Sequence, residues 1–364
     1  MNQPRVAEFF AGVGLVRKAV EQEGFRVVFA NDIDKVKAAV YSENGYGGIR
    51  CADVRTIRGR DVPEVDLATA SFPCTDLSLA GHRAGLRGRQ SGLLWEFIRI
   101  LREMGARRPR AVLLENVLGF ANSNGGSDLR ESILALNKFG YSADIVEVDA
   151  RRFTPQSRRR VFVIASREPL SGVATWTPCD LRPEWIIRFA NNHPELNLRP
   201  AALPELPDSG GEFSDIVDRF PARSSRWWEP DRTRSFRDSL STLQADRLGR
   251  MKRSGRLTWA TTYRRTRFGK PVWEIRGDGI SGCLRTTRGG SSKQAVVEAG
   301  RGAFRVRWMT ANEYARLQGA PDLRFAGVSE NQARFALGDA VCVPAVAWLA
   351  RNYLAPMLKR PARD

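Results

Sequence analysis

The chain has few of the residues that build metal centres and disulfide frameworks. Its 364 residues include only two histidines, His82 and His193, and five scattered cysteines that never form a Cys-x-x-Cys pair. We therefore expect no metal site, no histidine-based triad and no disulfide framework. This cysteine usage favours a reducing compartment, so we expect a cytoplasmic protein.

Long hydrophobic runs are also missing. No stretch of 18 consecutive apolar residues occurs, and the first residues do not form a charged and then apolar leader. We therefore expect neither a membrane span nor a secretory signal. Since 42% of the residues are hydrophobic, the chain is long enough for one large core and a second small one.

Basic residues are abundant, but few of them are lysines. The formal net charge is +18, and the 58 basic residues comprise 8 lysines and 50 arginines. Such an excess favours a polyanionic partner, whereas a general arginine bias of the source is the alternative. Residues 170–222 carry a net charge of −4 (4 basic, 8 acidic), and residues 223–293 carry +12 (18 basic, 6 acidic). A uniform bias would not change sign between neighbouring segments, so nucleic-acid binding is favoured.

Over the first 166 residues, short apolar runs alternate with segments of helical period. The expected strands are 5–10, 27–30, 65–70, 111–114, 143–148 and 161–165, and the expected helices are 14–23, 35–43, 93–104 and 129–139. This alternation predicts an α/β fold with a doubly wound, mostly parallel sheet and helices on both faces. Ligands of such sheets bind at the carboxyl ends of the strands.

The pattern changes after residue 166. Prolines and polar turn clusters follow, with a loop or linker at 206–212, before helical period returns at 311–317 and 330–354. We predict a first domain of residues 1–166 plus 305–364 and a second, smaller irregular domain of residues 167–304. The last helix is expected to pack on the first domain.

Four residues are candidates for covalent and acid chemistry. Cys74 follows a proline, and Glu115 ends an apolar run, so the pair could serve as nucleophile and acid. Arg158 and Arg160 lie two residues apart before another apolar run, which would place them on one side of an extended segment. The plainer readings are an inert buried cysteine, a solvated acid and a simple basic cluster.

The turn after the first expected strand is a candidate ligand site. Segment 10–14 (FAGVG) contains two glycines that let a backbone approach a ligand, and it opens a helix whose N-terminus favours anionic groups. A tight strand–helix turn without a ligand is the alternative. Asp32 follows the second expected strand and could accept ribose hydroxyls, or it could be a helix N-cap.

Six motifs occur in a diagnostic order: FAGVG at 10–14, SFPCTDLS at 71–78, ENV at 115–117, QSRRR at 156–160, TANEYARLQGAP at 310–321 and GDAV at 338–341. Together they resemble the DNA (cytosine-5)-methyltransferase family, over residues 5–166 and 305–355. The resemblance implies an S-adenosylmethionine-dependent methyltransferase fold, with residues 167–304 as target-recognition domain. It also implies methyl transfer to C5 of a flipped-out cytosine in a specific duplex DNA sequence, through an adduct of Cys74 at C6.

The resemblance assigns roles to particular residues. The implied catalytic residues are Cys74, Glu115, Arg158 and Arg160. The implied S-adenosylmethionine-binding residues are Phe10, Gly12, Gly14, Asp32, Ile33, Asp53, Val54, Pro73, Leu93, Asp339 and Val341. Phe10 would face the adenine, Asp32 would hold the ribose, and Asp53 would contact the adenine amino group. Three departures from the family pattern are Asp32 for Glu, Ile33 for an aromatic residue, and Asp339 for Asn.

DNA contacts are expected in three places. Ser78 matches a phosphate-contacting serine, and Arg83 lies in the polar stretch that follows Cys74. Two glycine-containing basic loops, 264–270 and 285–293, lie where the family places its recognition loops. Their candidate residues are Arg265, Arg267, Phe268, Arg285 and Arg288. An arginine there could read guanine or only hold phosphates, and Phe268 could fill the space of the flipped base or anchor a core.

Three other functions compete with this interpretation: a tRNA-directed enzyme of the same fold, a DNA-binding module without catalysis, and a dinucleotide oxidoreductase. The long basic insert favours duplex DNA over tRNA. The presence of Cys74 with Glu115 counts against an inactive module. An oxidoreductase would have no role for either residue. The expected partner is therefore duplex DNA. We expect a monomer that does not bind membranes, with a cognate restriction endonuclease encoded nearby.

Overall fold

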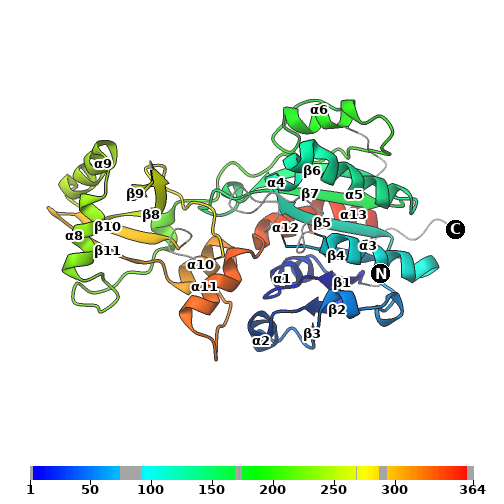
Figure 1. Cartoon of the computed structure of the whole chain (residues 1–364), viewed down its shortest axis with the longest axis horizontal. Coiled ribbons are helices and arrows are strands. Elements are labelled where there is room, and N and C mark those ends of the chain that lie inside the picture. The colour runs from blue at the N-terminus through cyan, green and yellow to red at the C-terminus, as the bar shows by residue number, and fades with distance from the viewer. Residues whose placement is uncertain are drawn as a thin grey trace. The chain divides into compact units, whose positions relative to one another are not determined.

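The computed structural model describes residues 3–73, 92–168, 172, 174–267, 269–286 and 293–358. Contacts divide the chain into two compact units (Figure 1). Unit 1 comprises residues 1–149, 159–206 and 343–364, and unit 2 comprises residues 150–158 and 207–342.

Unit 1 is built on a seven-stranded sheet in the order β3-β2-β1-β4-β5-β7-β6. Its strands are β1 (Arg5–Phe9), β2 (Arg26–Asp32), β3 (Arg50–Cys51), β4 (Leu67–Ala70), β5 (Ala111–Val117), β6 (Ser142–Asp149) and β7 (Arg159–Ser166). Strands β3, β2, β1, β4 and β5 run parallel to one another, whereas β7 is antiparallel to both β5 and β6. The predicted mostly parallel, doubly wound sheet is confirmed.

Helices flank this sheet (Figure 1). They are α1 (Leu15–Gln22), α2 (Lys35–Glu43), α3 (Leu93–Met104), α4 (Leu118–Asn122), α5 (Ser127–Asn137), α6 (Glu184–Asn192), α12 (Val343–Leu349) and α13 (Ala355–Leu358). The core joins Phe9 of β1, Leu114 of β5 and Phe97 of α3, all buried. Helix α12 packs against α1, so the predicted return of the chain's end to the first domain is confirmed.

Residues 167–206 pack with unit 1, although the sequence pattern placed a boundary at 166. Strand β6 carries a buried carboxylate, Asp144, which needs a cationic partner. Arg182 supplies it through two hydrogen bonds of 2.5 and 3.2 Å, and Asp144 also accepts from the Ala201 amide. The segment after β7 is therefore fixed to β6 by charge as well as by the apolar side of α6.

Unit 2 contains a four-stranded antiparallel sheet in the order β11-β10-β8-β9. Its strands are β8 (Thr258–Arg267), β9 (Lys270–Ile275), β10 (Ala295–Gly300) and β11 (Ala303–Trp308), and its helices are α7 (Phe213–Ile216), α8 (Pro230–Asp238), α9 (Thr242–Arg253), α10 (Ala311–Leu317) and α11 (Glu330–Gly338). The predicted second, smaller domain is confirmed, and it contains a small antiparallel sheet that the sequence pattern did not predict. Arginines dilute the apolar alternation of β8, although one sheet face still buries Trp273, Val297 and Val306 against α8 and α9.

The helix expected over 330–354 is broken into separate helices. Helix α11 ends at Gly338, where an added Cβ would lie 2.3 Å from the backbone of Arg285, and α12 begins with Pro344 in its first turn. Proline is tolerated there because the first amides of a helix lack intrahelical acceptors. By length and composition alone the run Glu330–Leu358 could cross a membrane, but 72% of its most apolar window is buried, as in a core helix.

The Asp144–Arg182 pair generates a stability prediction. Arg182→Ala should lower the free energy of unfolding by about 3–5 kcal/mol, because it leaves a buried carboxylate without its partner. Chemical denaturation followed by tryptophan fluorescence measures this loss. The control is Arg188→Ala on the exposed side of α6, which should change stability by no more than about 0.5 kcal/mol. Equal effects of the two variants would contradict the proposed anchoring.

Candidate active site

The β1–α1 turn has a backbone that opens toward a ligand. Phe10, Gly12 and Gly14 all have positive φ, at 56°, 56° and 85°. An added Cβ on Gly12 would meet nothing within 4 Å, whereas one on Gly14 would lie 2.7 Å from the Tyr46 ring. Gly14 is therefore required for internal packing, and Gly12 leaves free space beside the turn.

Asp32 connects this turn to the next one. Its carboxylate accepts from the Gly12 amide at 2.7 Å and from the Asp34 amide at 2.8 Å. The N-cap of α2 is Asp34, which accepts from the amides of Val36 and Lys37, so the N-cap reading of Asp32 was wrong. Asp32 instead positions the loops at the carboxyl ends of β1 and β2.

Glu8 lies beneath the turn and was missed by sequence reasoning. It is fully buried, accepts from the Arg17 amide in the first turn of α1 at 3.2 Å, and receives the Tyr41 hydroxyl at 3.4 Å. Burial raises the pKa of Glu8 to about 8. A lone acidic residue inside an apolar strand was the available sequence signal, because such a residue needs nearby donors.

The remaining expected cofactor residues of unit 1 follow neighbouring strands. Ile33, directly after β2, is a large apolar side chain that is 65% exposed. Asp53 pairs with Arg55 at 3.0 Å, and Val54 is buried in the short helix that follows. Pro73 comes after β4, and Leu93 opens α3. Ile33, Asp53 and Pro73 therefore follow the parallel strands β2, β3 and β4 at one edge of the sheet.

The expected nucleophile, Cys74, lies outside the described residues, as do Ser78 and Arg83. The chain leading to Cys74 is held by Asn116, whose side-chain amide donates to the Phe72 carbonyl at 3.0 Å in the buried interior. Asn116 also accepts from the Val117 amide at 2.9 Å. It is thus a positioning residue that sequence reasoning missed, although it directly follows Glu115.

Glu115 and Arg160 form an ion pair. Their Oε1 and Nε atoms are 3.0 Å apart, and their side chains are only 9% and 13% exposed. Residue Glu115 is opposite Phe162, and Val117 is opposite Arg160, in the antiparallel β5–β7 register. The two charged residues are therefore diagonal neighbours on one sheet face, within reach of long side chains.

Arg158 has different partners from Arg160. Its buried guanidinium donates to the carbonyls of Leu284 at 2.9 Å, Gly338 at 3.2 Å and Ala340 at 2.6 Å, all within unit 2. Arg158 directly precedes β7, which begins at Arg159, and its partners differ from the Glu115 partner of Arg160. Through these hydrogen bonds Arg158 holds the backbone of the loops that it contacts.

Two buried glutamines, Gln156 and Gln318, also hydrogen-bond to loop backbone. We call Gln156, Arg158 and Gln318 the polar hub. Gln156 donates to the Leu317 carbonyl at 2.8 Å and accepts from the Leu284 amide at 3.1 Å. Gln318 donates to the carbonyls of Leu337 and Ala340. The hub joins four separate chain segments of unit 2 and fixes the start of the loop at 285–293.

Comparisons with known proteins show the family of the chain. The family description "C-5 cytosine-specific DNA methylase" matches residues 4–355. The chain belongs to this family. The chain is 27% identical to Type II methyltransferase M.HhaI of Haemophilus parahaemolyticus, over 96% of this chain and 93% of that one. Type II methyltransferase M.Bsp6I of Bacillus sp. is 35% identical, over 45% of this chain and 52% of the relative's length.

Solved structures show the same fold. Entamoeba histolytica methyltransferase EhMeth superposes with a TM-score of 0.65 and 14% identity, covering 99% of both chains. The Spodoptera frugiperda DNMT2 mutant gives a TM-score of 0.64 and 16% identity, covering 98% of this chain and 100% of that one. By its family membership, the chain is a DNA cytosine-5 methyltransferase.

The other expected residues of this methyltransferase lie in unit 2. Asp339 is exposed at the end of α11, and Val341 is buried. Arg265 and Arg267 lie on one face of β8, and both pair with Glu274 of β9, at 3.4 and 2.8 Å. Burial opposes ionisation of Glu274, yet hydrogen bonds from Arg267 and Tyr263 hold its pKa below the usual range.

Arg285 is exposed after the hub, whereas Phe268 and Arg288 lie outside the described residues. Among the residues that the structure describes, no group of three or more His, Cys, Asp or Glu side chains could hold a metal ion.

The polar hub generates a second prediction. Gln156→Ala should remove the acceptor of the Leu284 amide and lower stability by about 1–3 kcal/mol. Hydrogen exchange with mass spectrometry should show faster exchange in peptides covering 281–286 and unchanged exchange in β5. Gln244→Ala, which removes the acceptor of the Ile275 amide at the end of β9, is the matched control and should leave 281–286 protected. Unchanged exchange in Gln156→Ala would refute the role of the hub.

Proposed function

We propose that this enzyme transfers the methyl group of S-adenosylmethionine to C5 of a flipped-out cytosine in a specific duplex DNA sequence, through a covalent adduct of Cys74 at C6. The observation that carries the proposal is the Glu115–Arg160 pair beside the chain segment that leads to Cys74. The Glu115 carboxyl lies on β5, the strand adjacent to β4, and is 3.0 Å from the Arg160 guanidinium. Both groups are nearly buried, where water competes little for a bound base.

The residues of unit 1 suit S-adenosylmethionine. The space beside Gly12 admits a ligand close to the backbone, and exposed Ile33 offers an apolar contact for an adenine ring. Asp32 is already fixed by two amides, so its carboxylate could receive ribose hydroxyls without reorganisation. Phe10, Gly14, Asp53, Val54, Pro73 and Leu93 are assigned to the same site from the family motifs. When bound, S-adenosylmethionine supplies an electrophilic methyl group on its sulfonium.

The chemical steps use side chains of this chain. The Cys74 thiolate adds to C6 of cytosine, which makes C5 an enamine carbon able to take the methyl group. Glu115 takes up a proton when the base binds and donates it to N3, which favours this addition, while Arg160 holds the carboxyl and orients the base carbonyl. Solvent water then takes the C5 proton while the C6–sulfur bond breaks, which releases 5-methylcytosine and restores the Cys74 thiolate. Arg158 acts indirectly, by positioning loop backbone.

We assign sequence recognition to unit 2, which contains residues 207–304 of the predicted target-recognition domain 167–304. Among the described residues, Arg285 is the better candidate for base reading, because Arg265 and Arg267 are held by Glu274 in this structure. Arg288 is assigned to recognition from its place in the loop sequence alone. Since several relatives are named Type II methyltransferases, a monomer acting in a cytoplasmic restriction-modification system, with a partner endonuclease, is the biological setting that we infer. Asp339 and Val341 are assigned to the cofactor from the motif alone.

Cys74→Ser should abolish methyl transfer while leaving DNA binding largely intact, because the sulfur forms the covalent bond and binding energy comes from other residues. Bisulfite sequencing of DNA from host cells that express either protein identifies the methylated sequence and measures the loss of methylation. Wild type should also form a denaturant-stable adduct with duplex DNA carrying 5-fluorocytosine at the target. The matched control is Cys179→Ser, an exposed cysteine that should retain full activity. A fully active Cys74→Ser variant, or methylation of tRNA only, would overturn the proposal.

A further inference from the structure

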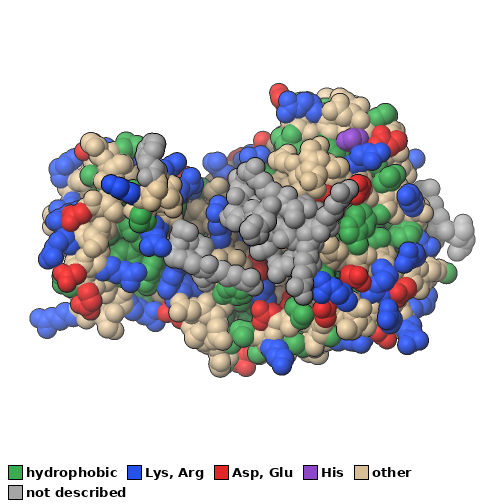
Figure 2. Space-filling model, viewed as in Figure 1, with side chains coloured by type: hydrophobic (Ala, Val, Ile, Leu, Met, Phe, Trp, Pro, Cys, Tyr) green, Lys and Arg blue, Asp and Glu red, His purple; other side chains and the backbone are tan. Residues whose placement is uncertain are grey.

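Five basic side chains gather at one end of unit 2, and we call this group the basic tip. They are Arg250, Lys252, Arg253, Arg256 and Arg301. The first three belong to the last turns of α9, and Arg301 belongs to the β10–β11 turn. Hydrogen bonds from the Arg301 amide to the Ser254 carbonyl (2.7 Å) and from the Gly302 amide to the Lys252 carbonyl (2.9 Å) join these two segments. Basic side chains line this end in Figure 2, where α9 and the β10–β11 turn lie in Figure 1.

The charge of the basic tip is not neutralised within the described part of the chain. None of the five side chains forms an ion pair there; Arg301 donates only to the Gly255 carbonyl, and Lys252 lies 5.8 Å from the Phe304 ring centre. The surrounding sequence, residues 247–273, contains nine basic and no acidic residues. The helix dipole accounts for cations in the last turn of α9, but Arg256 and Arg301 lie beyond it.

The basic tip lies at the opposite end of the small sheet from the expected recognition loops. The β8–β9 hairpin and the start of β10 carry the loops at 264–270 and 285–293, whereas the end of β10 adjoins the tip. Strand β10 spans Ala295–Gly300, which at about 3.4 Å per residue amounts to roughly 17 Å. This length corresponds to about five base pairs of B-DNA.

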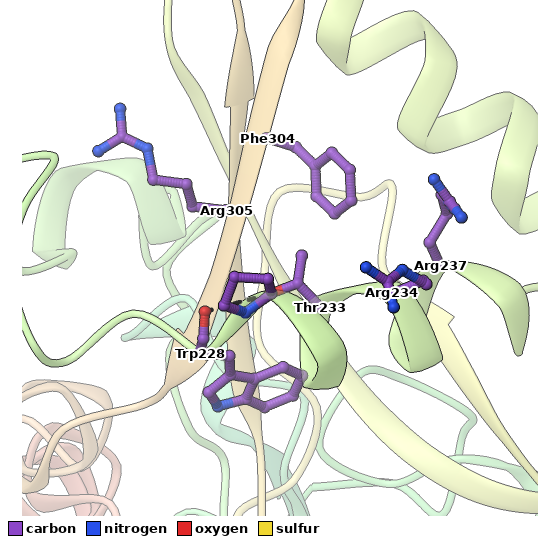
Figure 3. A pocket seen from close by; sticks show the side chains of 7 residues that line it. Trp228, Thr233, Arg234, Arg237, Phe304 and Arg305 are labelled. Atoms are coloured by element: carbon purple, nitrogen blue, oxygen red, sulfur yellow. Dashed lines mark hydrogen bonds between the residues drawn. The ribbon is translucent and has the colours of Figure 1, made fainter.

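A pocket of about 320 Å³ lies next to the basic tip, since Phe304 lines the pocket and its ring centre is 5.8 Å from the Lys252 ammonium group. Trp228 and Phe304 form its apolar part, and the guanidinium groups of Arg234, Arg237 and Arg305 surround it (Figure 3). Arg234 and Arg237 pair only with exposed neighbours on α8, at 3.1 and 2.9 Å. Exposed ion pairs are weak, so these arginines can exchange their partners for phosphates. The pocket thus extends the cationic surface of the tip along β11.

We propose that the basic tip binds the phosphate backbone of duplex DNA that flanks the recognised sequence on one side, about five base pairs from the bases read by the loops. The occupant follows from charge complementarity: a row of unneutralised cations matches a polymer with one charge per about 1.7 Å. The proposal rests on the proposed function in taking duplex DNA as substrate, and it adds a contact outside the recognised sequence. Such a contact raises affinity without reading sequence.

The test uses the triple variant Arg250→Ala/Arg253→Ala/Arg256→Ala of the full chain. Equilibrium binding is measured on duplexes that carry the recognised sequence with a 2-base-pair or a 10-base-pair flank, on either side in turn. Wild type should bind more tightly when one particular flank is long, and the triple variant should lose this gain. On that duplex the slope of log affinity against log salt should fall in magnitude by about 2–3, since each lost phosphate contact removes about one.

The control variant, Arg60→Ala/Arg102→Ala/Arg188→Ala, removes three exposed arginines of unit 1 and should behave as wild type. Both variants should methylate the short duplex at the wild-type rate and melt at similar temperatures. Wild-type affinity that is independent of either flank, or an unchanged salt slope in the triple variant, would overturn the proposal. Failure of wild type to bind or methylate any duplex would instead refute the proposed function.

Discussion

The antiparallel pairing of β7 with β5 is the constraint on which the site depends. In a fully parallel sheet, the residues after β5 and those before the next strand would lie at opposite edges. Reversal of β7 brings its first residues beside the last residues of β5, so Arg160 lies diagonal to Glu115. Each charged side chain is nearly buried, and each would be costly there without the other. The sheet topology therefore places an acid and its cationic partner where β4 leads toward Cys74.

Around this pair, polar side chains hold the backbone through hydrogen bonds. Asn116 fixes the chain before Cys74, Asp32 fixes the turns after β1 and β2, and Glu8 supports the first turn of α1. In unit 2 the polar hub performs the same task for the loop that begins at Arg285. Loops with satisfied hydrogen bonds lose less freedom when a ligand binds, so these contacts prepare the site in advance.

The sequence predicted the first unit well because its strands are short apolar runs that alternate with helical segments. Helices α2 and α3 begin and end at the predicted residues, and the motif residues follow the expected strands. The small sheet escaped prediction because β8 mixes threonine, tryptophan and arginine, so its apolar face is recognisable only against α8 and α9. The partners of Arg158 could not be predicted either, since it contacts residues more than 120 positions away in sequence. Long-range pairing of this kind depends on tertiary structure, which a local pattern does not contain.

The most direct test of the account is a double-mutant cycle on Glu115 and Arg160, measured as single-turnover methyl transfer with enzyme in excess over duplex DNA. If the two residues act as one unit, Glu115→Gln and Arg160→Met should each lower the rate constant by about 10²-fold or more. The double variant should then be little slower than either single variant, because the second substitution removes nothing further. Multiplicative losses in the double variant, or a single variant with the wild-type rate, would contradict the account.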